Sequence, residues 1–223
     1  QSYDNLELLI LDDCSAEVPF EEIRDCAEGC ITRFPFEIYR NEHNLGSTKT
    51  FEKLTTFARG EYIAYCDQDD IWHRDKIELC WQEIESSSGE LVFSDVNIID
   101  GAGKKAANSI TEVRKHHKFQ SGPGLYKPLL FGNFVIGCTL MIRKENAQNA
   151  LPFCPYMVHD HWLALYSSIN GEIIFIDKPL IDYRIHDNNQ TLMMAGVSNK
   201  DSYLNIRINE ALKKYLWLQE QIG

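Results

Sequence analysis

The sequence predicts an α/β fold with a mainly parallel sheet that is flanked by helices and followed by a C-terminal helix. Three observations lead to this expectation. Short apolar runs alternate with amphipathic segments over residues 1–95, which is the pattern of strands connected by helices. Acidic residues follow several of these runs, and residues 201–221 repeat apolar side chains at helical spacing. The 223 residues, 44% of them hydrophobic, are enough for one compact unit.

The expected elements of the first half are a strand at 6–11, a helix from about Pro19, a strand at 36–40, a helix at 47–58, a strand at 61–66, a helix at 74–86 and a strand at 90–95. Proline suits the first turn of a helix, and Ser47 is the expected cap of the helix at 47–58. Because helices separate the strands, the strands are expected to run parallel.

The second half begins with residues 100–124, which are basic and rich in Gly, Ser and Asn. We expect a long surface loop there. A strand at 138–142, a helix at 159–169, strands near 172–177 and 179–186 and a helix at 201–221 are expected to follow. The last helix has one apolar face, which predicts docking on the body or on a second copy of the chain; this face consists of Leu204, Ile208, Leu212, Tyr215 and Leu218.

Composition limits the classes of function. The net charge of −11 argues against a nucleic-acid partner, because nucleic-acid binding relies on basic patches. Seven scattered cysteines indicate reduced, buried thiols, and a zinc site at Cys26 and Cys30 is the alternative. The longest apolar stretch, residues 129–142, is too short to span a bilayer. We expect a cytoplasmic protein, and peripheral association with the inner face of the cell membrane stays an open alternative.

The stretch AYCDQDDIW places Asp67, Asp69 and Asp70 within four residues, directly after an expected strand. Carboxylates so close repel one another, but Mg²⁺ or Mn²⁺ prefers such oxygen ligands and would remove the repulsion. Ile71 and Trp72 are expected to anchor this turn in the core. Asp12, Asp13 and Asp95 also stand at expected strand ends, and parallel strands bring their carboxyl ends to one edge of a sheet. The carboxylates are therefore expected to converge.

Two other interpretations apply to this acidic cluster, and a third is excluded. It can be a solvated turn in which Asp69 or Asp70 caps the next helix. It can belong to a phosphohydrolase with an aspartate nucleophile, although FSDVNIID matches the second acidic motif of such enzymes poorly. A calcium loop is excluded by spacing, because Ile71 stands where a third oxygen ligand is needed and no glycine follows.

Seven stretches, taken in order, resemble family 2 glycosyltransferases of the GT-A (Rossmann-like) fold, in the branch that includes rhamnosyltransferase-like proteins: QSYDNLELLILDDCS, NLGSTKTFEKL, ARGEYIAYCDQDDIW, FSDVNIID, GNFVIGCTLMI, HDHWLAL and PLIDYRIHDNN. The resemblance covers residues 1–190. It implies a nucleotide-sugar-binding half at 1–95 and an acceptor-binding half at 96–190 of one domain, with a helical extension at 191–223. Family members carry one more strand and helix before the position of Gln1, so an N-terminally incomplete domain with impaired activity is expected.

The resemblance also implies roles for residues of the donor site. Asp12 and Asp13 match the acidic pair that holds the base and ribose of the nucleotide, and a capping role is the alternative for one of them. Asp67 and Asp69 match the DxD motif that holds a divalent metal on the diphosphate. Asp70 lies beside them as a support or sugar contact. Lys49, near an expected helix N-terminus, can meet phosphate charge, although an exposed surface lysine is the simpler interpretation.

Two further residues complete the implied site. Asp160 in HDHW matches the general base of the family, with His159 in place of the usual glutamate; the alternative is a helix N-cap. A base is needed because the acceptor hydroxyl loses a proton as it attacks. His186 lies where relatives place a residue near the diphosphate and metal, and a structural histidine is the alternative.

The implied activity is metal-dependent inverting transfer of a hexosyl or rhamnosyl group from a nucleoside-diphosphate sugar to a glycan or lipid-linked glycan, in cell-surface polysaccharide synthesis. The cofactor is Mg²⁺ or Mn²⁺, and the partners are the sugar nucleotide and the acceptor. Two alternatives remain: a non-catalytic module that binds nucleotide sugars or glycans, and the DxD phosphohydrolase.

Overall fold

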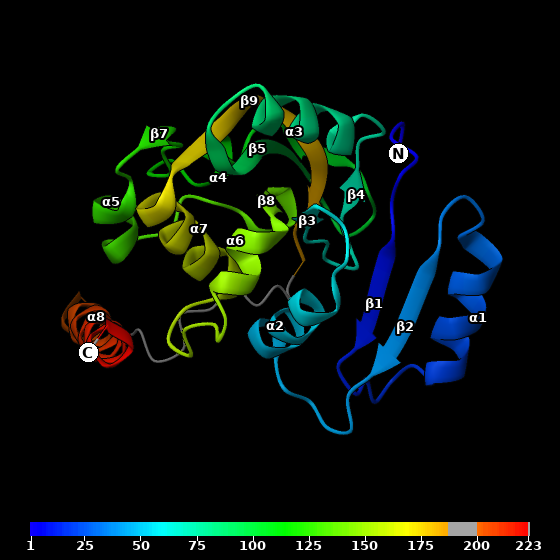
Figure 1. Ribbon diagram of the computed structural model, residues 1–223, viewed down its shortest axis with the longest axis horizontal. Helices are drawn as coiled ribbons and strands as arrows, with labels where there is room; N and C mark the ends of the chain where they lie inside the picture. Colours follow the sequence, from blue (N-terminus) through cyan, green and yellow to red (C-terminus); the bar gives the residue numbers. More distant parts are fainter. Residues whose placement is uncertain (187–199, 223) are drawn as a thin grey trace.

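The computed structural model describes residues 1–186 and 200–222, and Figure 1 shows their arrangement. The strands are β1 (Leu8–Asp12), β2 (Phe36–Arg40), β3 (Tyr62–Ala64), β4 (Ile71–Trp72), β5 (Gly89–Ile99), β6 (Lys105–Ala107), β7 (Gly122–Pro123), β8 (Met141–Arg143) and β9 (Glu172–Arg184). The helices are α1 (Phe20–Cys30), α2 (Ser47–Phe57), α3 (Lys76–Glu85), α4 (Ile110–Val113), α5 (Tyr126–Phe131), η1 (Gly137–Thr139), α6 (Lys144–Asn149), α7 (His159–Asn170) and α8 (Lys200–Ile222).

The larger sheet is mixed rather than mainly parallel. Its strands follow the order β3-β8-β5-β9-β4, with β6 beside β5 and β7 beside β9. Only β5 and β9 run parallel in this sheet, and the pairs β3–β8, β5–β8 and β4–β9 are antiparallel. The expectation of a mainly parallel sheet was therefore wrong for this part. An apolar run specifies a buried strand but not its direction, and β8 and β4 enter the sheet without a helical crossover of their own.

A second, two-stranded sheet contains β1 and β2, which run parallel in register from Leu8–Phe36 to Asp12–Arg40. Together with α1 they form a separate layer at the right of Figure 1. Glu7 ties this layer to the larger sheet, because its carboxylate accepts hydrogen bonds from the backbone N–H groups of Arg59 and Gly60, just before β3. The carboxyl ends of β1 and β3 are thereby held on the same body.

Helices cover both faces of the larger sheet. Along β5, Leu91 and Phe93 face a core that includes residues of α5, α6 and α7, whereas Val92 faces α3 on the other side. This alternation follows from the period of two along a strand. All these β5 side chains are fully buried. The result is an α/β sandwich whose central strand, β5, is apolar on both faces.

Several boundaries differ from the sequence-based expectation. Residues 172–177 and 179–186 are not two strands, because β9 runs unbroken from Glu172 to Arg184 through Pro179. The expected loop at 100–124 contains β6, α4 and β7. Gly46, with a φ of 80°, is the N-cap of α2 instead of Ser47. The expected strand at 138–142 is divided between η1 and β8.

The C-terminal helix α8 is present, but most of its predicted apolar face is exposed; Leu204, Ile208, Leu212 and Tyr215 are exposed, and only Leu218 packs against the core. Trp217 also packs against the core, with its ring edge-on to that of Trp162 at a centroid distance of 5.1 Å. Lys213 lies over the ring of Tyr156, and Lys214 is buried, so the described contacts of α8 with the body lie in its second half. Residues 187–199, which include the start of the expected helical extension at 191–223, lie outside the described residues.

Candidate active site

The acidic cluster lies on the loop between β3 and β4, and β9 holds this loop in place. The backbone N–H of Arg184 donates to Oδ1 of Asp70 at 2.9 Å, and Nε of Arg184 donates to the carbonyl of Asp69 at 2.8 Å. Trp72 anchors the loop, because its ring packs against two core clusters and lies 3.6 Å from the buried ammonium of Lys76. Ile71 does not anchor it, since this side chain is 50% exposed; neighbours on a strand point to opposite faces.

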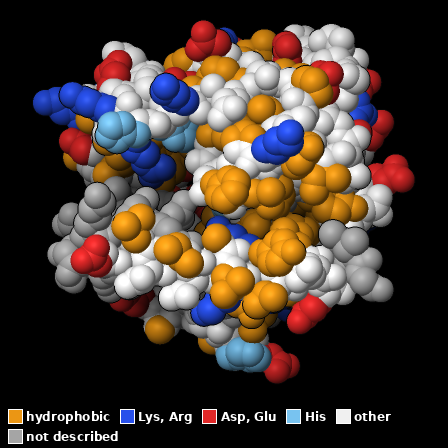
Figure 2. Space-filling view, turned by 90° about the vertical axis from the view of Figure 1, so that its left-hand side faces the viewer, with side chains coloured by type: hydrophobic (Ala, Val, Ile, Leu, Met, Phe, Trp, Pro, Cys, Tyr) orange, Lys and Arg blue, Asp and Glu red, His pale blue; other side chains and the backbone are white. Residues whose placement is uncertain are grey.

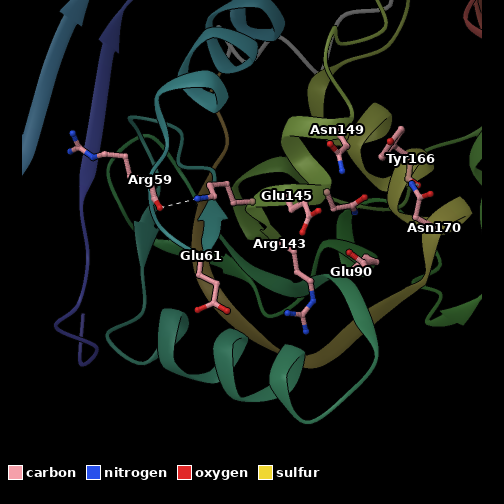
Figure 3. Close-up of a pocket in the computed structure, with 10 residues that line it drawn as sticks. Arg59, Glu61, Glu90, Arg143, Glu145, Asn149, Tyr166 and Asn170 are labelled. Carbon is pink, nitrogen blue, oxygen red and sulfur yellow. Dashed lines mark hydrogen bonds between the residues drawn. The ribbon is translucent and has the colours of Figure 1, made fainter.

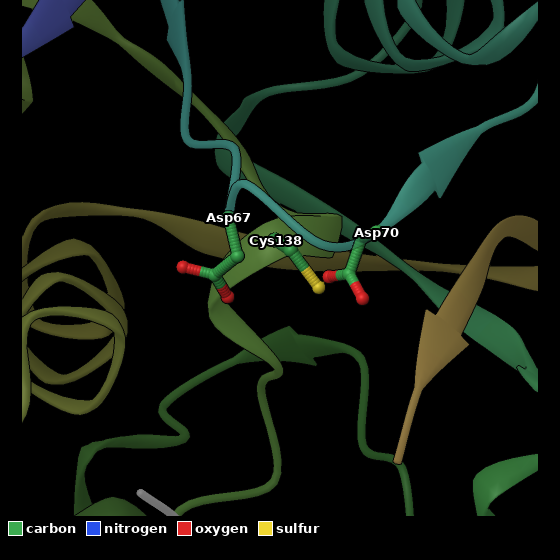
Figure 4. Close-up of side chains that lie close together, drawn as sticks. All are labelled: Asp67, Asp70 and Cys138. Carbon is green, nitrogen blue, oxygen red and sulfur yellow. The ribbon is translucent and has the colours of Figure 1, made fainter. Parts of the chain in front are cut away.

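Asp67 and Asp70 meet Cys138 of η1 in the interior of the site (Figure 4), with their ligand atoms within 4.8 Å of one another. Burial raises the pKa of Asp67 to about 7, with further contributions from the carboxylates of Asp70 and Asp69. Burial also raises the pKa of the Cys138 thiol, and the charges of Asp70 and Asp67 add to this. The thiol therefore stays protonated and donates to Asp70.

The carboxylate of Asp69 is not part of this group and meets His186, whose Nε2 lies 2.8 Å from Oδ2 of Asp69. His186 follows the end of β9, so the sheet brings together two residues that are 117 positions apart in the chain. Both side chains are partly accessible to solvent. The structure thus places His186 beside the acidic loop, and its role as a metal ligand stays a prediction.

The chemistry of these donors fits a hard divalent cation. Carboxylate oxygens and one imidazole nitrogen are acceptable ligands for Mg²⁺ or Mn²⁺, whereas a protonated thiol is not. Oδ2 of Asp70 is buried without an N–H or O–H donor among the described residues. The pKa of Asp67 is raised first by burial and then by the neighbouring carboxylates, and a bound cation would favour its ionised form.

Asp160 lies in the first turn of α7 and faces the same site. Its Oδ1 accepts hydrogen bonds from the side chain of Asn133 at 3.1 Å and from the backbone N–H of His161 at 2.6 Å. Burial raises the pKa of Asp160 to about 6, although these hydrogen bonds oppose the rise. The charge of Asp160 also contributes to the raised pKa of Asp67, so the two carboxylates share one electrostatic environment. Val158, not Asp160, is the N-cap residue of α7.

His159 lies beside Asp160 in the chain, and its imidazole ring packs against two aromatic rings. Its ring centroid lies 4.3 Å from that of Phe51 and 5.4 Å from that of Tyr65. Burial lowers the pKa of His159 to about 3, so the imidazole carries no charge at neutral pH. A Cβ on Gly137 would stand 2.9 Å from Nε2 of His159 and 3.2 Å from Oδ2 of Asp160. The backbone of η1 therefore needs glycine here to approach both side chains.

Asp12 and Asp13 end β1 and make hydrogen bonds within the protein. Oδ1 of Asp12 accepts from the backbone N–H of Ser15 at 3.0 Å. Asp13 accepts from the side chain of Asn41 and from the N–H groups of residues 45 and 46, each at 2.8 Å. Burial opposes ionisation of Asp13, but these hydrogen bonds prevail and lower its pKa. Both carboxylates stabilise loops at the carboxyl end of β1, and their contact with a nucleotide stays a prediction.

Lys49 and Asp95 do not join the cluster in this structure. Nζ of Lys49 lies 2.9 Å from Glu52 on the same helix, and the side chain is 46% exposed, as the simpler interpretation had it. Asp95 lies in the middle of β5, and its Oδ1 accepts from the N–H groups of Val96 and Ile110. The expectation that Asp95 ends a strand was wrong, because β5 continues to Ile99.

The cysteines form no disulfide and only three are buried: Cys80, Cys138 and Cys154. Cys26 and Cys30 are exposed on α1, and among the described residues they do not belong to the group of three side chains, Asp67, Asp70 and Cys138, that lie close enough together to share an ion. None of the described helices is long and apolar enough to cross a membrane.

A cavity of about 560 Å³ lies away from the acidic cluster, between the β3–β8 edge and α6 (Figure 3). None of the expected site residues lines it. Several of its charged side chains have partners of their own: Lys144 donates to the carbonyl of Arg59, and Arg143 donates to the carbonyl of Gly89. This cavity therefore does not define the candidate site.

Three residues of the site were missed from sequence: Asn133, Gly137 and Cys138. All three belong to GNFVIGC, a stretch in which no single residue was assigned a role. Gly132 and Gly137 within an apolar run were an available signal, because glycine inside such a run marks a close approach of the backbone.

Comparison with known proteins gives the following relationships. The profile of glycosyl transferase family 2 matches residues 1–148. The amylovoran biosynthesis glycosyltransferase AmsB of Erwinia amylovora is 24% identical over 195 residues, covering 83% of this chain and 62% of AmsB. The dTDP-rhamnosyl transferase RfbG of Shigella flexneri is 26% identical, covering 79% of this chain and 60% of RfbG. The chain thus spans about three fifths of the length of these curated relatives.

The fold is similar to that of S. aureus TarS residues 1–349, solved in complex with UDP-GlcNAc. The TM-score is 0.64 at 17% sequence identity, and the match covers 93% of this chain and 57% of the TarS chain.

Proposed function

Because the chain belongs to glycosyl transferase family 2, we propose that it transfers a sugar from a nucleoside-diphosphate sugar to a hydroxyl group of a glycan or lipid-linked glycan, with inversion at the anomeric carbon. Relatives named for amylovoran biosynthesis and for dTDP-rhamnosyl transfer support a role in surface polysaccharide synthesis. Another relative, WfgD of Escherichia coli, is named as a glucosyltransferase that acts on a diphosphoundecaprenol-linked sugar. The donor in this chain is a hexosyl or rhamnosyl nucleotide.

The observation that carries the proposal is the pairing of Asp160 with the acidic loop. Asp160 has a pKa of about 6, so its carboxylate is mostly ionised at pH 7 and basic enough to accept the proton of an attacking hydroxyl. Asn133 and the N–H of His161 fix its orientation. The hydroxyl oxygen forms the new bond to the anomeric carbon as the bond to the diphosphate breaks. The proton passes to Asp160.

Asp67, Asp69 and His186 would hold a divalent cation, Mg²⁺ or Mn²⁺, at the mouth of the loop. When bound, this cation supplies positive charge that stabilises the diphosphate leaving group. Asp70 supports the loop through Arg184 and can contact the donor sugar. Asp12 and Asp13 remain the proposed contacts of the nucleotide, and Lys49 would have to leave Glu52 to reach a phosphate.

A thermal-shift screen of UDP-, dTDP- and GDP-sugars tests the donor half of this proposal. We expect one donor to raise the melting temperature in Mn²⁺ or Mg²⁺ and to lose this effect in EDTA, because a ligand of the folded state stabilises it. Asp69→Ala should abolish the metal-dependent shift, and Asp25→Ala, an exposed carboxylate on α1, should preserve it.

Two results would favour the alternatives. Binding of a sugar nucleotide without transfer or hydrolysis over long incubation would indicate a non-catalytic module. Release of inorganic phosphate from simple phosphomonoesters, without any response to sugar nucleotides, would indicate a phosphohydrolase.

A further inference from the structure

The charge of this chain is distributed unevenly. Although the net charge is −11, residues 113–144 contain no Asp or Glu. The cations at the start of this segment are Arg114, Lys115, Lys118 and Lys127. The three lysines are exposed, and no ion pair of the described residues includes Lys115 or Lys118. An acidic protein thus carries a local concentration of positive charge in this part of the chain.

Exposed apolar side chains accompany these cations. In the short helix α5, Leu129 is fully buried in the core, whereas Tyr126, Leu130 and Phe131 are exposed, the last of them by 74%. Val113 is 50% exposed at the other end of the segment. We name residues 113–118 together with α5 the basic-apolar surface. Figure 2 shows Lys, Arg and His side chains gathered at the upper left of the face on this side of the molecule, next to hydrophobic side chains.

The basic-apolar surface adjoins the candidate active site. A cavity of about 830 Å³ is lined by residues 113–118 and also by Pro128, Asn133 and Phe134. Asn133 donates a hydrogen bond to Asp160, the proposed base. A molecule bound at this surface is therefore close to Asn133, whose side chain contacts Asp160, the proposed acceptor of the proton.

We propose that the basic-apolar surface docks the protein onto the anionic headgroups of a lipid bilayer. Cations attract an anionic leaflet, and aromatic and aliphatic side chains beside them enter the boundary between headgroups and acyl chains. The rest of the chain is acidic and is repelled by such a leaflet, so docking has one orientation. This inference goes beyond the proposed function, because docking requires no sugar transfer.

Co-sedimentation with vesicles, without any sugar nucleotide, tests the proposal. We expect the protein to bind vesicles of phosphatidylcholine mixed with phosphatidylglycerol, to bind pure phosphatidylcholine weakly, and to dissociate at high salt. Lys115→Gln/Lys118→Gln should weaken binding roughly 30-fold at low salt, since each lysine near an anionic surface contributes about fivefold. Phe131→Ser should weaken it roughly tenfold.

Matched controls separate docking from general effects. Arg24→Gln/Arg74→Gln makes the same change in net charge at exposed positions elsewhere, and Val18→Ser removes an exposed apolar side chain from the α1 layer. Neither should change vesicle binding. Thermal melting should be the same for all four variants, because the substituted side chains are exposed.

The proposal is overturned if anionic and neutral vesicles bind equally, or if the control variants lose as much affinity as the test variants. Saturation of the surface by free pyrophosphate, with no affinity for vesicles, would also overturn it and would assign the surface to a soluble phosphate. Loss of vesicle binding with donor binding intact would affect this inference alone, whereas failure of the donor screen would affect only the proposed function.

Discussion

At the scale of single residues, the pKa of Asp160 predicts how the rate depends on pH. The carboxylate must be ionised to accept a proton, and burial raises its pKa to about 6. We expect kcat/KM to rise with pH as one proton is lost, with half of the maximal value near pH 6, when measured at a saturating concentration of cation. A rate that stays constant well below this pH would contradict the role of Asp160.

Asp67 makes a second prediction at this scale, for the metal-free protein. Its pKa is about 7 in the folded protein against 3.8 for a free carboxyl, so folding favours the protonated form. The stability that this group contributes is complete below pH 3.8 and is lost as pH rises through 7. Asp67→Asn should therefore increase the free energy of unfolding at pH 8 by about 1–3 kcal/mol and change it little at pH 4. Urea unfolding in EDTA at the two pH values measures the difference.

Gly137 gives a third prediction at the scale of single residues. Gly137→Ala should lower stability by about 1–3 kcal/mol and reduce turnover, because the new methyl group would collide with His159 beside Asp160. Gly101→Ala is the matched control, since a Cβ there meets nothing within 4 Å. Equal effects of the two substitutions would show that η1 tolerates a side chain and does not position the base.

At the scale of elements, the pairing of Trp217 with Trp162 is one of the contacts that hold α8 on the body. Trp217→Ala should lower the free energy of unfolding by about 1–3 kcal/mol, because the ring packs edge-on against Trp162. Tyr215→Ala, two residues away and 57% exposed, should change it by less than about 0.5 kcal/mol. Chemical denaturation of both variants gives the comparison, and a larger loss for Tyr215→Ala would mean that the predicted apolar face is the docking face.

The elements also show what periodicity can and cannot predict. Apolar runs and helical spacing located β1, β2, β3, β5, α1, α2, α3, α7 and α8. Strand direction was not predictable in the same way, because an apolar run such as that of β8 looks alike in either direction. The end of β5 was missed because the alternation continues through polar residues, Asp95 and Asn97, that hydrogen bonds make tolerable inside the sheet.

The candidate site was predictable in part for a similar reason. The acidic loop was identified from its pattern of carboxylates, whereas Asp160 and His186 were proposed from the family resemblance, and their roles stay predictions. The contribution of Asn133, Gly137 and Cys138 depends on how η1 approaches α7 and the loop after β3. Glycine inside an apolar run indicates a close approach of the backbone but not the element that is approached. The partner of Asp69 also depends on the path of β9, which brings His186 back to the loop.

At the scale of the whole molecule, the residues proposed for the donor and those proposed for the acceptor come from different parts of the fold. In the proposed reaction, the β1–α1–β2 layer and the loop after β3 would supply carboxylates for a sugar nucleotide and its metal. The segment from α4 to η1 and the start of α7 would supply the base and its hydrogen-bond partners, and they carry the basic-apolar surface. Transfer requires that both sets act on one anomeric carbon, and the electrostatic coupling of Asp67 with Asp160 supports this arrangement.

The most direct test compares turnover of the wild-type chain and Asp160→Asn, with the donor identified by thermal shift and an acceptor glycan. Nucleoside diphosphate release coupled to product formation is the measurement. The account predicts that the variant binds the donor with unchanged affinity and loses turnover by about 10²–10⁴-fold, the usual contribution of a general base. Undiminished turnover by Asp160→Asn would contradict it.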